Sequence, residues 1–251
     1  MSDTNPEKFA GLTFDDFRRR ANDPELSPCE KVGFPDSYRA GKESVIFEDI
    51  LSKLPLLGGR GQVVLEIGPG CSHLPVMLVE VCRAREHRLI LVDSEEMLAH
   101  LPDAPFVTKI AACYPSCESL FETHRGSIGV ILTYSVLHHV FAEANVWEFM
   151  DRSLELLAPG GEMLIGDLPN VSKRKRFFAS AAGVRFHREF SGTSGSPDVS
   201  FNQVERKSID DAVIVSLLLR ARSAGFDAYL LPQGPGLPMA NRREDILIRR
   251  P

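Results

Sequence analysis

Short apolar runs alternate with longer amphipathic stretches through most of the chain. Five short apolar runs are typical of buried parallel strands, and they lie at residues 62–67, 88–92, 106–111, 128–134 and 162–166. Apolar residues at helical spacing predict helices over residues 73–87, 94–100 and 136–157. A further helix over residues 208–224, ended by Gly225, precedes two last strands at residues 227–231 and 245–249.

This alternation of strands and helices predicts the fold class. It indicates an α/β protein with an open, doubly wound, mostly parallel sheet of seven strands and helices on both faces. Sheets of this kind bind ligands at the carboxyl ends of their strands, near the point where the strand order reverses. The chemistry of the chain is therefore expected in the loops that follow strands.

Two segments fall outside the alternation. Residues 1–58 are predicted to form an N-terminal helical lid, with a short helix capped by Thr13 and a second helix over residues 38–53. Residues 59–251 form the predicted main domain. Within it, residues 171–207 follow the fifth strand, are rich in Lys, Arg, Phe, Ser and Gly, and are predicted to be an insert that covers a substrate.

Composition narrows the classes of protein that the chain can belong to. Its 251 residues, 43% hydrophobic and 25% charged, suit one large domain. A net charge of −5 argues against a surface that grips nucleic acid, so a nucleic-acid partner is not expected. No apolar stretch lies in the first twenty residues, and later apolar runs are too short to span a bilayer. Five cysteines without a framework spacing favour a reducing compartment, so we expect a cytoplasmic protein.

The turn after the first strand, residues 66–72, carries the most informative chemistry. Gly68 and Gly70 allow the backbone to turn sharply and a ligand to approach closely, and the following helix directs its N–H groups at the same place. A dinucleotide site favours a third glycine where this chain has His73. Glu66 would repel a pyrophosphate, whereas it suits a ligand with a cationic amine. The sequence of this turn therefore argues against NAD as the ligand.

Four segments resemble, in order and spacing, the motifs of class I S-adenosylmethionine-dependent methyltransferases. They are residues 63–70 (VVLEIGPG), 91–94 (LVDS), 131–139 (ILTYSVLHH) and 156–161 (LLAPGG). The closing pair of strands is also similar to that family, whose last strand is antiparallel. The resemblance covers roughly residues 60–170 and 208–250. It implies an enzyme with S-adenosylmethionine as cofactor and a small-molecule acceptor.

The resemblance also implies roles for individual residues. Glu66 and the backbone of Gly68 and Gly70 would hold the methionine end of the cofactor, and Asp93 would bind its ribose. The other residues placed at the cofactor are Tyr38, Pro69, Ser94, Met97, Ala112, Cys113, Tyr134 and Ser135. Of these, Met97 would pack on the adenine, Tyr134 and Ser135 would lie beside the sulfonium, and Tyr38 in the lid would cap the carboxylate.

Two positions depart from the pattern of the family. An acid that often follows the third strand and binds the adenine amino group is replaced here by Ala112 and Cys113. The common aspartate at the start of the fourth strand appears as Gly129. We therefore expect altered adenine recognition. The same departures leave open a cofactor-binding protein without catalysis, although Glu66 and Asp93 argue against it.

Methyl transfer is an in-line displacement, so the chain must align the nucleophile and, for a hydroxyl, accept its proton. His138, His139 and Asp167 follow the fourth and fifth strands and are the candidate catalytic residues, while His187 in the insert is a candidate substrate contact. Each has a structural alternative, because a histidine can pack and cap the helix it begins and Asp167 can cap the next turn.

Metal chemistry is not predicted. Ser135, His138 and His139 lie at the i, i+3, i+4 spacing at which some relatives bind a divalent ion, but the acids that accompany them there are missing. Cys113 and Cys117 have no second pair, so buried thiols are the favoured interpretation.

Two basic clusters bear on the acceptor. Residues 173–176 (KRKR) follow the fifth strand, and Arg242 and Arg243 belong to the loop after the sixth, so the fold brings both to one edge. They predict an anionic, hydrophilic acceptor such as a nucleotide-linked or phosphorylated sugar in glycan biosynthesis. A natural-product tailoring enzyme with an aromatic or polyketide acceptor is the alternative, with Phe177, Phe178, Phe186 and Phe190 lining its pocket. A nucleic-acid methyltransferase is a further, less favoured alternative.

Overall fold

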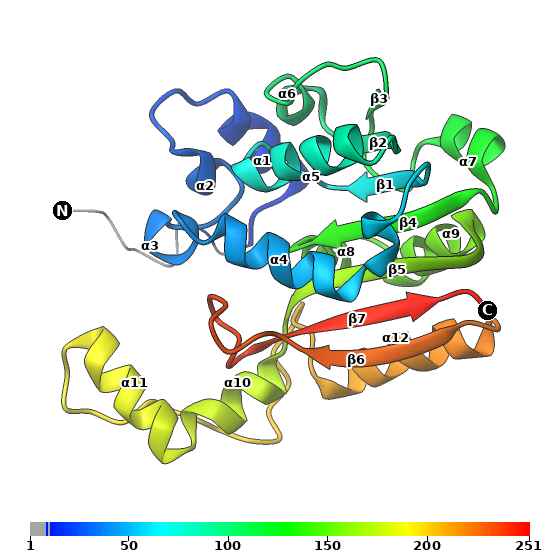
Figure 1. Cartoon of the computed structure of the whole chain (residues 1–251). Coiled ribbons are helices and arrows are strands. Elements are labelled where there is room, and N and C mark those ends of the chain that lie inside the picture. The colour runs from blue at the N-terminus through cyan, green and yellow to red at the C-terminus, as the bar shows by residue number, and fades with distance from the viewer. Residues whose placement is uncertain (1–8, 10) are drawn as a thin grey trace.

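The computed structural model describes residue 9 and residues 11–251 and confirms the predicted α/β fold (Figure 1). Seven strands form one sheet in the order β3-β2-β1-β4-β5-β7-β6. They are β1 (Val63–Ile67), β2 (Arg88–Asp93), β3 (Val107–Ala111), β4 (Ile128–Tyr134), β5 (Leu157–Pro169), β6 (Asp227–Pro232) and β7 (Arg243–Arg249). Pairing is parallel from β3 to β5, and β7 is antiparallel to both β5 and β6. The predicted antiparallel last strand is therefore confirmed.

Helices cover both faces of the sheet, and each face has its own apolar core. One face packs against α4 (Glu43–Lys53), the 3-10 turn η2 (Pro55–Gly58), α5 (His73–Ala84) and α6 (Glu95–Leu98). The other packs against α7 (Glu118–His124), α8 (Leu137–Glu143), α9 (Val146–Leu156) and α12 (Asp211–Ser223). Strands β1 and β4 are buried along their whole length, as their continuous apolar runs require. No helix in the described part of the chain has the length and apolar character to span a bilayer.

The N-terminal segment folds into short helices at the carboxyl edge of the sheet (Figure 1). Helix α1 (Phe14–Ala21) begins with the predicted Thr13 cap, which forms a reciprocal capping box with Asp16. The helix contacts α6, and Arg18 forms an ion pair with Glu96 at 2.9 Å. Helices α2 (Pro28–Lys31) and α3 (Asp36–Arg39) follow. The predicted single helix over residues 38–53 is wrong, because Gly41 at φ +73° separates α3 from α4.

One other predicted element needs correction. The helix predicted over residues 136–157 is broken into α8 and α9, because Ala144 is extended and the Asn145 side chain accepts N–H bonds from Trp147 and Glu148 to start a new helix. Residues 171–207, where the alternation stops, contain α10 (Val171–Phe178) and α11 (Ala181–Ser191), which project from the body of the molecule (Figure 1).

Candidate cofactor and active site

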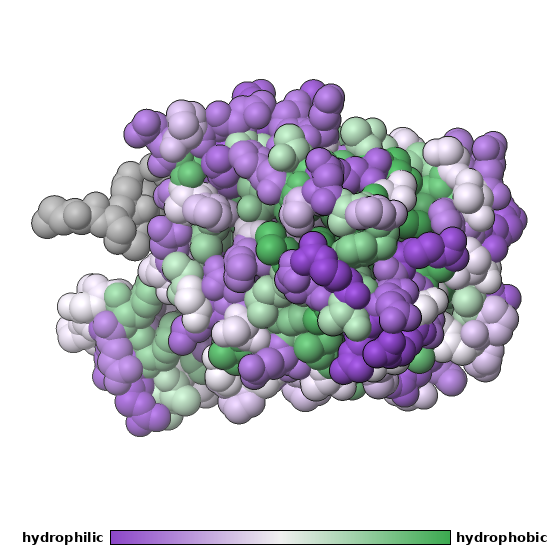
Figure 2. Space-filling view, turned by 45° about the horizontal axis from the view of Figure 1, so that its top comes forward, coloured by the Kyte–Doolittle hydropathy of each residue, from purple (hydrophilic) through white to green (hydrophobic). Residues whose placement is uncertain are grey.

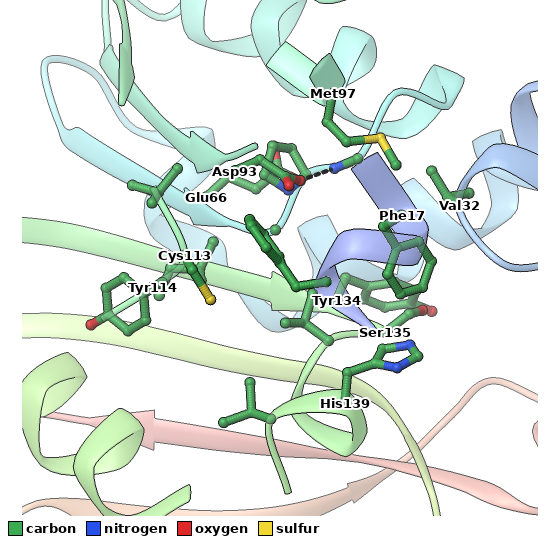
Figure 3. A pocket seen from close by; sticks show the side chains of 18 of the residues that line it. Phe17, Val32, Glu66, Asp93, Met97, Cys113, Tyr114, Tyr134, Ser135 and His139 are labelled. Carbon is green, nitrogen blue, oxygen red and sulfur yellow. Dashed lines mark hydrogen bonds between the residues drawn. The ribbon is translucent and has the colours of Figure 1, made fainter. Parts of the chain in front are cut away.

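A cavity of about 300 Å³ lies at the carboxyl ends of β1, β2 and β4, beneath the N-terminal helices (Figure 3). It sits where the strand order reverses between β1 and β4, the position expected for an open α/β sheet. Most residues predicted at the cofactor line it, namely Glu66, Gly68, Pro69, Gly70, Asp93, Met97, Ala112, Cys113, Tyr134 and Ser135. The N-terminal segment contributes side chains that the sequence analysis missed, namely Phe14, Phe17, Val32, Phe34 and Arg39.

The glycine turn after β1 keeps this cavity open. Gly68 and Gly70 have φ values of +67° and +65°, a backbone conformation that residues with a side chain rarely adopt. A Cβ at Gly68 would lie 2.6 Å from the side chain of Val136, and a Cβ at Gly70 would lie 2.6 Å from Val32. Both positions therefore need glycine for backbone conformation and for space.

Two acids face the cavity from adjacent strands (Figure 3). Glu66 is buried, and its Oε2 atom has no hydrogen-bond partner among the described residues. Burial, with the nearby charge of Asp93, raises the pKa of Glu66 to about 8. Glu66 is therefore an unpaired carboxyl in the cavity wall, suited to a ligand that brings positive charge.

Asp93 is held by the backbone around it. Its Oδ2 accepts the N–H of Gly70 at 2.9 Å, and its Oδ1 accepts the N–H of Ser94 at 2.7 Å. Burial raises the pKa of Asp93 to about 6, although the two backbone donors oppose this shift. Each oxygen keeps a lone pair that can accept from a ligand hydroxyl. Ser94 itself does not line the cavity; its hydroxyl caps α6 by accepting the N–H of Met97.

The lid contributes Arg39 to the cavity, and not the neighbouring Tyr38. Arg39 is buried and its Nη2 contacts both Ser135 and Asp167, the latter at 2.8 Å. Tyr38 lies outside the cavity and stacks on Phe190 of α11, with ring centroids 6.2 Å apart. The predicted position of Tyr38 at the cofactor is thus corrected, because the short α3 helix turns successive side chains to different sides.

Asp167 is the centre of a buried polar network and does not line the cavity. Its Oδ2 accepts from Arg39, from Ser135 and, at 2.9 Å, from Arg243, while its N–H donates to Asp245 at 2.8 Å. Ser135 and Asp167 both adopt left-handed φ values near +60°, at the ends of β4 and β5. These contacts hold two strained turns and the lid arginine in one arrangement.

The two predicted histidines occupy different environments. His139 lines the cavity, packs edge-on against Phe17 with ring centroids 4.9 Å apart, and lies close to the backbone of Leu12. Burial lowers the pKa of His139 to about 4, so its ring is neutral at pH 7. His138 does not line the cavity, and burial lowers its pKa well below the usual range. Within the described residues, no group of three or more His, Cys, Asp or Glu side chains is placed to hold a metal ion.

The basic residues predicted to form an anion clamp contact acids of the chain itself. Arg174 and Lys175 pair with Glu205, and Arg176 pairs with Asp211. Arg243 is occupied by Asp167, and the Lys173 ammonium donates to the backbone oxygen of Arg243 at 2.8 Å. These contacts correct the expectation of an open clamp, because the acids that neutralise it come from segments whose proximity the sequence does not show.

Aromatic side chains join the insert to the lid. Phe186 and Phe190 of α11 stack at 6.0 Å, and Phe190 stacks in turn on Tyr38. The Arg242 guanidinium lies over the Phe186 ring, 6.0 Å from its centroid, and is close to Tyr38. Phe190 is 61% exposed, and Figure 2 shows hydrophobic surface on the projecting lobe beside hydrophilic residues at its tip. His187 lies in this insert against Phe178 and does not line the cavity.

Several solved structures of methyltransferases are similar in fold to this chain. The chain is similar to the CurJ carbon methyltransferase (TM-score 0.55, 18% identity), covering 90% of this chain and 61% of CurJ. It is also similar to the N-methyltransferase NodS from Bradyrhizobium japonicum WM9 in complex with S-adenosyl-L-homocysteine (TM-score 0.55, 12% identity). This match covers 95% of this chain and 98% of NodS. The chain is similar as well to a chain in the complex between the Haloferax volcanii Trm112 methyltransferase activator and a methyltransferase. The TM-score is 0.55 and the identity 12%, and the match covers 94% of this chain and 97% of the other.

No protein-family model matches the sequence, and no curated protein matches it. Structural similarity at these identities establishes the fold. The chain therefore has the fold of the class I S-adenosylmethionine-dependent methyltransferases, as the sequence motifs predict.

Proposed function

We propose that the protein binds S-adenosylmethionine in this cavity and transfers its methyl group to a small-molecule acceptor. The observation that carries the proposal is the buried, unpartnered Glu66 carboxyl beside a glycine turn that has no room for side chains. A buried carboxyl group without a hydrogen-bond partner is costly, and a ligand cation would both satisfy it and favour its ionised form. The methionine ammonium of the cofactor is such a group.

The chain's residues fit the remaining parts of this cofactor. Asp93, held by the N–H of Gly70, would accept the two ribose hydroxyls, and Met97 and Cys113 line the end where the adenine would lie. Arg39 lines the cavity and would hold the methionine carboxylate, the role predicted for Tyr38. When bound, the cofactor supplies an electrophilic methyl group on a positively charged sulfur.

The reacting edge is formed by Tyr134, Ser135 and His139. With the cofactor bound, the residues at this edge would align the acceptor with the methyl group and exclude water from it. His139 is neutral and is the predicted base that reaches the cavity surface, where it would accept the acceptor's proton. Asp167 acts as a positioning residue through Ser135 and Arg39, and His138 supports the His139 ring from behind.

For the acceptor, we favour a small molecule with an aromatic or other apolar portion. Tyr38 is the neighbour of the cavity-lining Arg39 in α3, and it stacks on Phe190, which stacks on Phe186. An acceptor that reaches the cavity past α3 would contact this aromatic surface. A phosphorylated or nucleotide-linked sugar is the second candidate. It is favoured by Arg242, whose guanidinium lies over the Phe186 ring, forms no ion pair with an acid among the described residues and would pair with an anionic acceptor.

Calorimetric titration tests the cofactor proposal. S-adenosylmethionine and S-adenosylhomocysteine should bind with micromolar or tighter affinity, and NAD should not bind. Binding of NAD alone would refute the proposal. Transfer of a radiolabelled methyl group to aromatic acids and to phosphorylated sugars would then identify the acceptor class. Phe186→Ala should raise KM for the former, and Arg242→Ala should raise KM for the latter in a salt-dependent manner.

A further inference from the structure

The adenine end of the cavity lacks an acid after β3. Ala112 and Cys113 line it there, and Tyr114 follows. Burial, with the charges of nearby acids, raises the pKa of Cys113, so its side chain is a neutral thiol and a weak acceptor. The strand that follows Asp93 in the sheet therefore offers no carboxylate to the exocyclic amine of an adenine.

A carboxylate reaches the same end of the cavity from another element. Glu143 is the last residue of α8, and it lines the cavity together with Val140 one turn earlier. Its charge is close enough to Cys113 to raise the pKa of that thiol. Two segments that are thirty residues apart in sequence thus meet at the adenine end.

The position of Glu143 has no structural explanation within the fold. A negative charge at the carboxyl end of a helix is disfavoured by the helix dipole, since the unpaired carbonyl oxygens there are also negative. Glu143 forms no hydrogen bond or ion pair with another described side chain, whereas many exposed acids of this chain do. An acid that lines a cavity, has no partner among the described side chains and is unfavourably placed for its helix is suited to a donor on a ligand.

We propose that Glu143 accepts a hydrogen bond from the exocyclic amine of the cofactor's adenine and replaces the acid that is absent after β3. This inference rests on the proposed function and adds a specificity determinant to it. The acceptor oxygen comes from the helix after β4, so adenine recognition depends on the turn between α8 and α9. Because Glu143 is solvent-exposed, it discriminates between bases and contributes less to total affinity.

The test compares two ligands that differ at one position of the base. S-adenosylhomocysteine carries an amine donor at C6, and S-inosylhomocysteine carries a carbonyl acceptor there. A carboxylate should bind the amine and repel the carbonyl, so the wild type should prefer the adenosyl ligand by about tenfold or more. Glu143→Ala should reduce this preference to within about threefold, mainly by weakening the adenosyl ligand. Glu143→Gln, whose amide can donate to the carbonyl, should bind the inosyl ligand more tightly than the wild type does.

Glu148→Gln provides the matched control. Glu148 is an exposed acid in the first turn of α9, close in sequence to Glu143, and it does not line the cavity. It should leave the preference unchanged. An undiminished preference for the adenosyl ligand in a folded Glu143→Ala variant would overturn the inference while leaving the proposed function intact. A wild type that binds neither ligand would instead refute the proposed function.

Discussion

Binding of the cofactor should release about one proton, and Glu66→Gln should abolish this release. In the empty site the pKa of Glu66 is raised to about 8, first by burial and then by the charge of Asp93. At pH 7 its carboxyl is therefore about 90% protonated. A ligand ammonium placed against it lowers that pKa by several units and ionises the group. About 0.9 proton leaves Glu66, and Asp93, with a pKa of about 6, adds roughly 0.1.

The sign of the pH dependence follows from the direction of this shift. Because the free protein binds the extra proton, affinity for the ammonium ligand increases as the pH rises toward 8. The increase approaches tenfold per pH unit between pH 6 and pH 7, where the ligand's amine stays protonated. At pH 7, ionising Glu66 costs about 1.4 kcal/mol, or about tenfold in affinity.

Calorimetry in buffers with different ionisation enthalpies measures the released protons directly. A plot of observed enthalpy against buffer enthalpy should show about one proton for the wild type binding S-adenosylhomocysteine at pH 7, and about 0.1 for Glu66→Gln. Glu162→Gln is the matched control, because Glu162 is also a buried acid with a pKa raised by burial but lies outside the cavity. It should release the same number of protons as the wild type. A wild-type value near zero would refute the assignment of the ammonium to Glu66.

Three further outcomes follow from the site. Gly68→Ala should weaken cofactor binding tenfold or more, as measured by titration. Gly160 has a similar positive φ but lies in open space, so Gly160→Ala should keep its affinity and lose only about 1 kcal/mol of stability in denaturation. Asp93→Ala should lower affinity at least about tenfold, and an unchanged dissociation constant would mean that the ribose is held elsewhere. Arg39→Ala leaves the buried Asp167 with one guanidinium fewer and should cost about 3 kcal/mol of unfolding free energy, whereas Asp167→Asn in the same background should recover part of the loss.

The hydrophobic pattern by itself determined the strands of the sheet and the position of the glycine turn after β1. Buried parallel strands need continuous apolar runs, and the runs at β1 and β4 mark their strands closely. Glu66, the glycine turn and Asp93 lie at strand ends, so their convergence follows from the parallel arrangement alone. Local signals such as the Thr13 cap were equally readable.

The helix breaks were marked by local residues, but the regular spacing of apolar residues continued across them and predicted single helices. Apolar spacing continues across residues 136–157, yet Asn145 followed by Glu148 three positions later is a helix-start pattern, and the structure uses it. Gly41 likewise ends α3 before α4 begins. These breaks matter for function, because they bring Glu143 and Arg39 to the cavity wall.

Only the tertiary structure decided which charges are free. The basic residues of α10 and Arg243 at the start of β7 look like an anion site in sequence, but Glu205, Asp211 and Asp167 form ion pairs with them. Ion pairing between distant segments depends on where the backbone places each side chain, and hydrophobic periodicity carries no information about that placement. For the same reason Arg39, and not Tyr38, faces the cavity, since a rotation of one residue about a helix axis turns a side chain by about 100°.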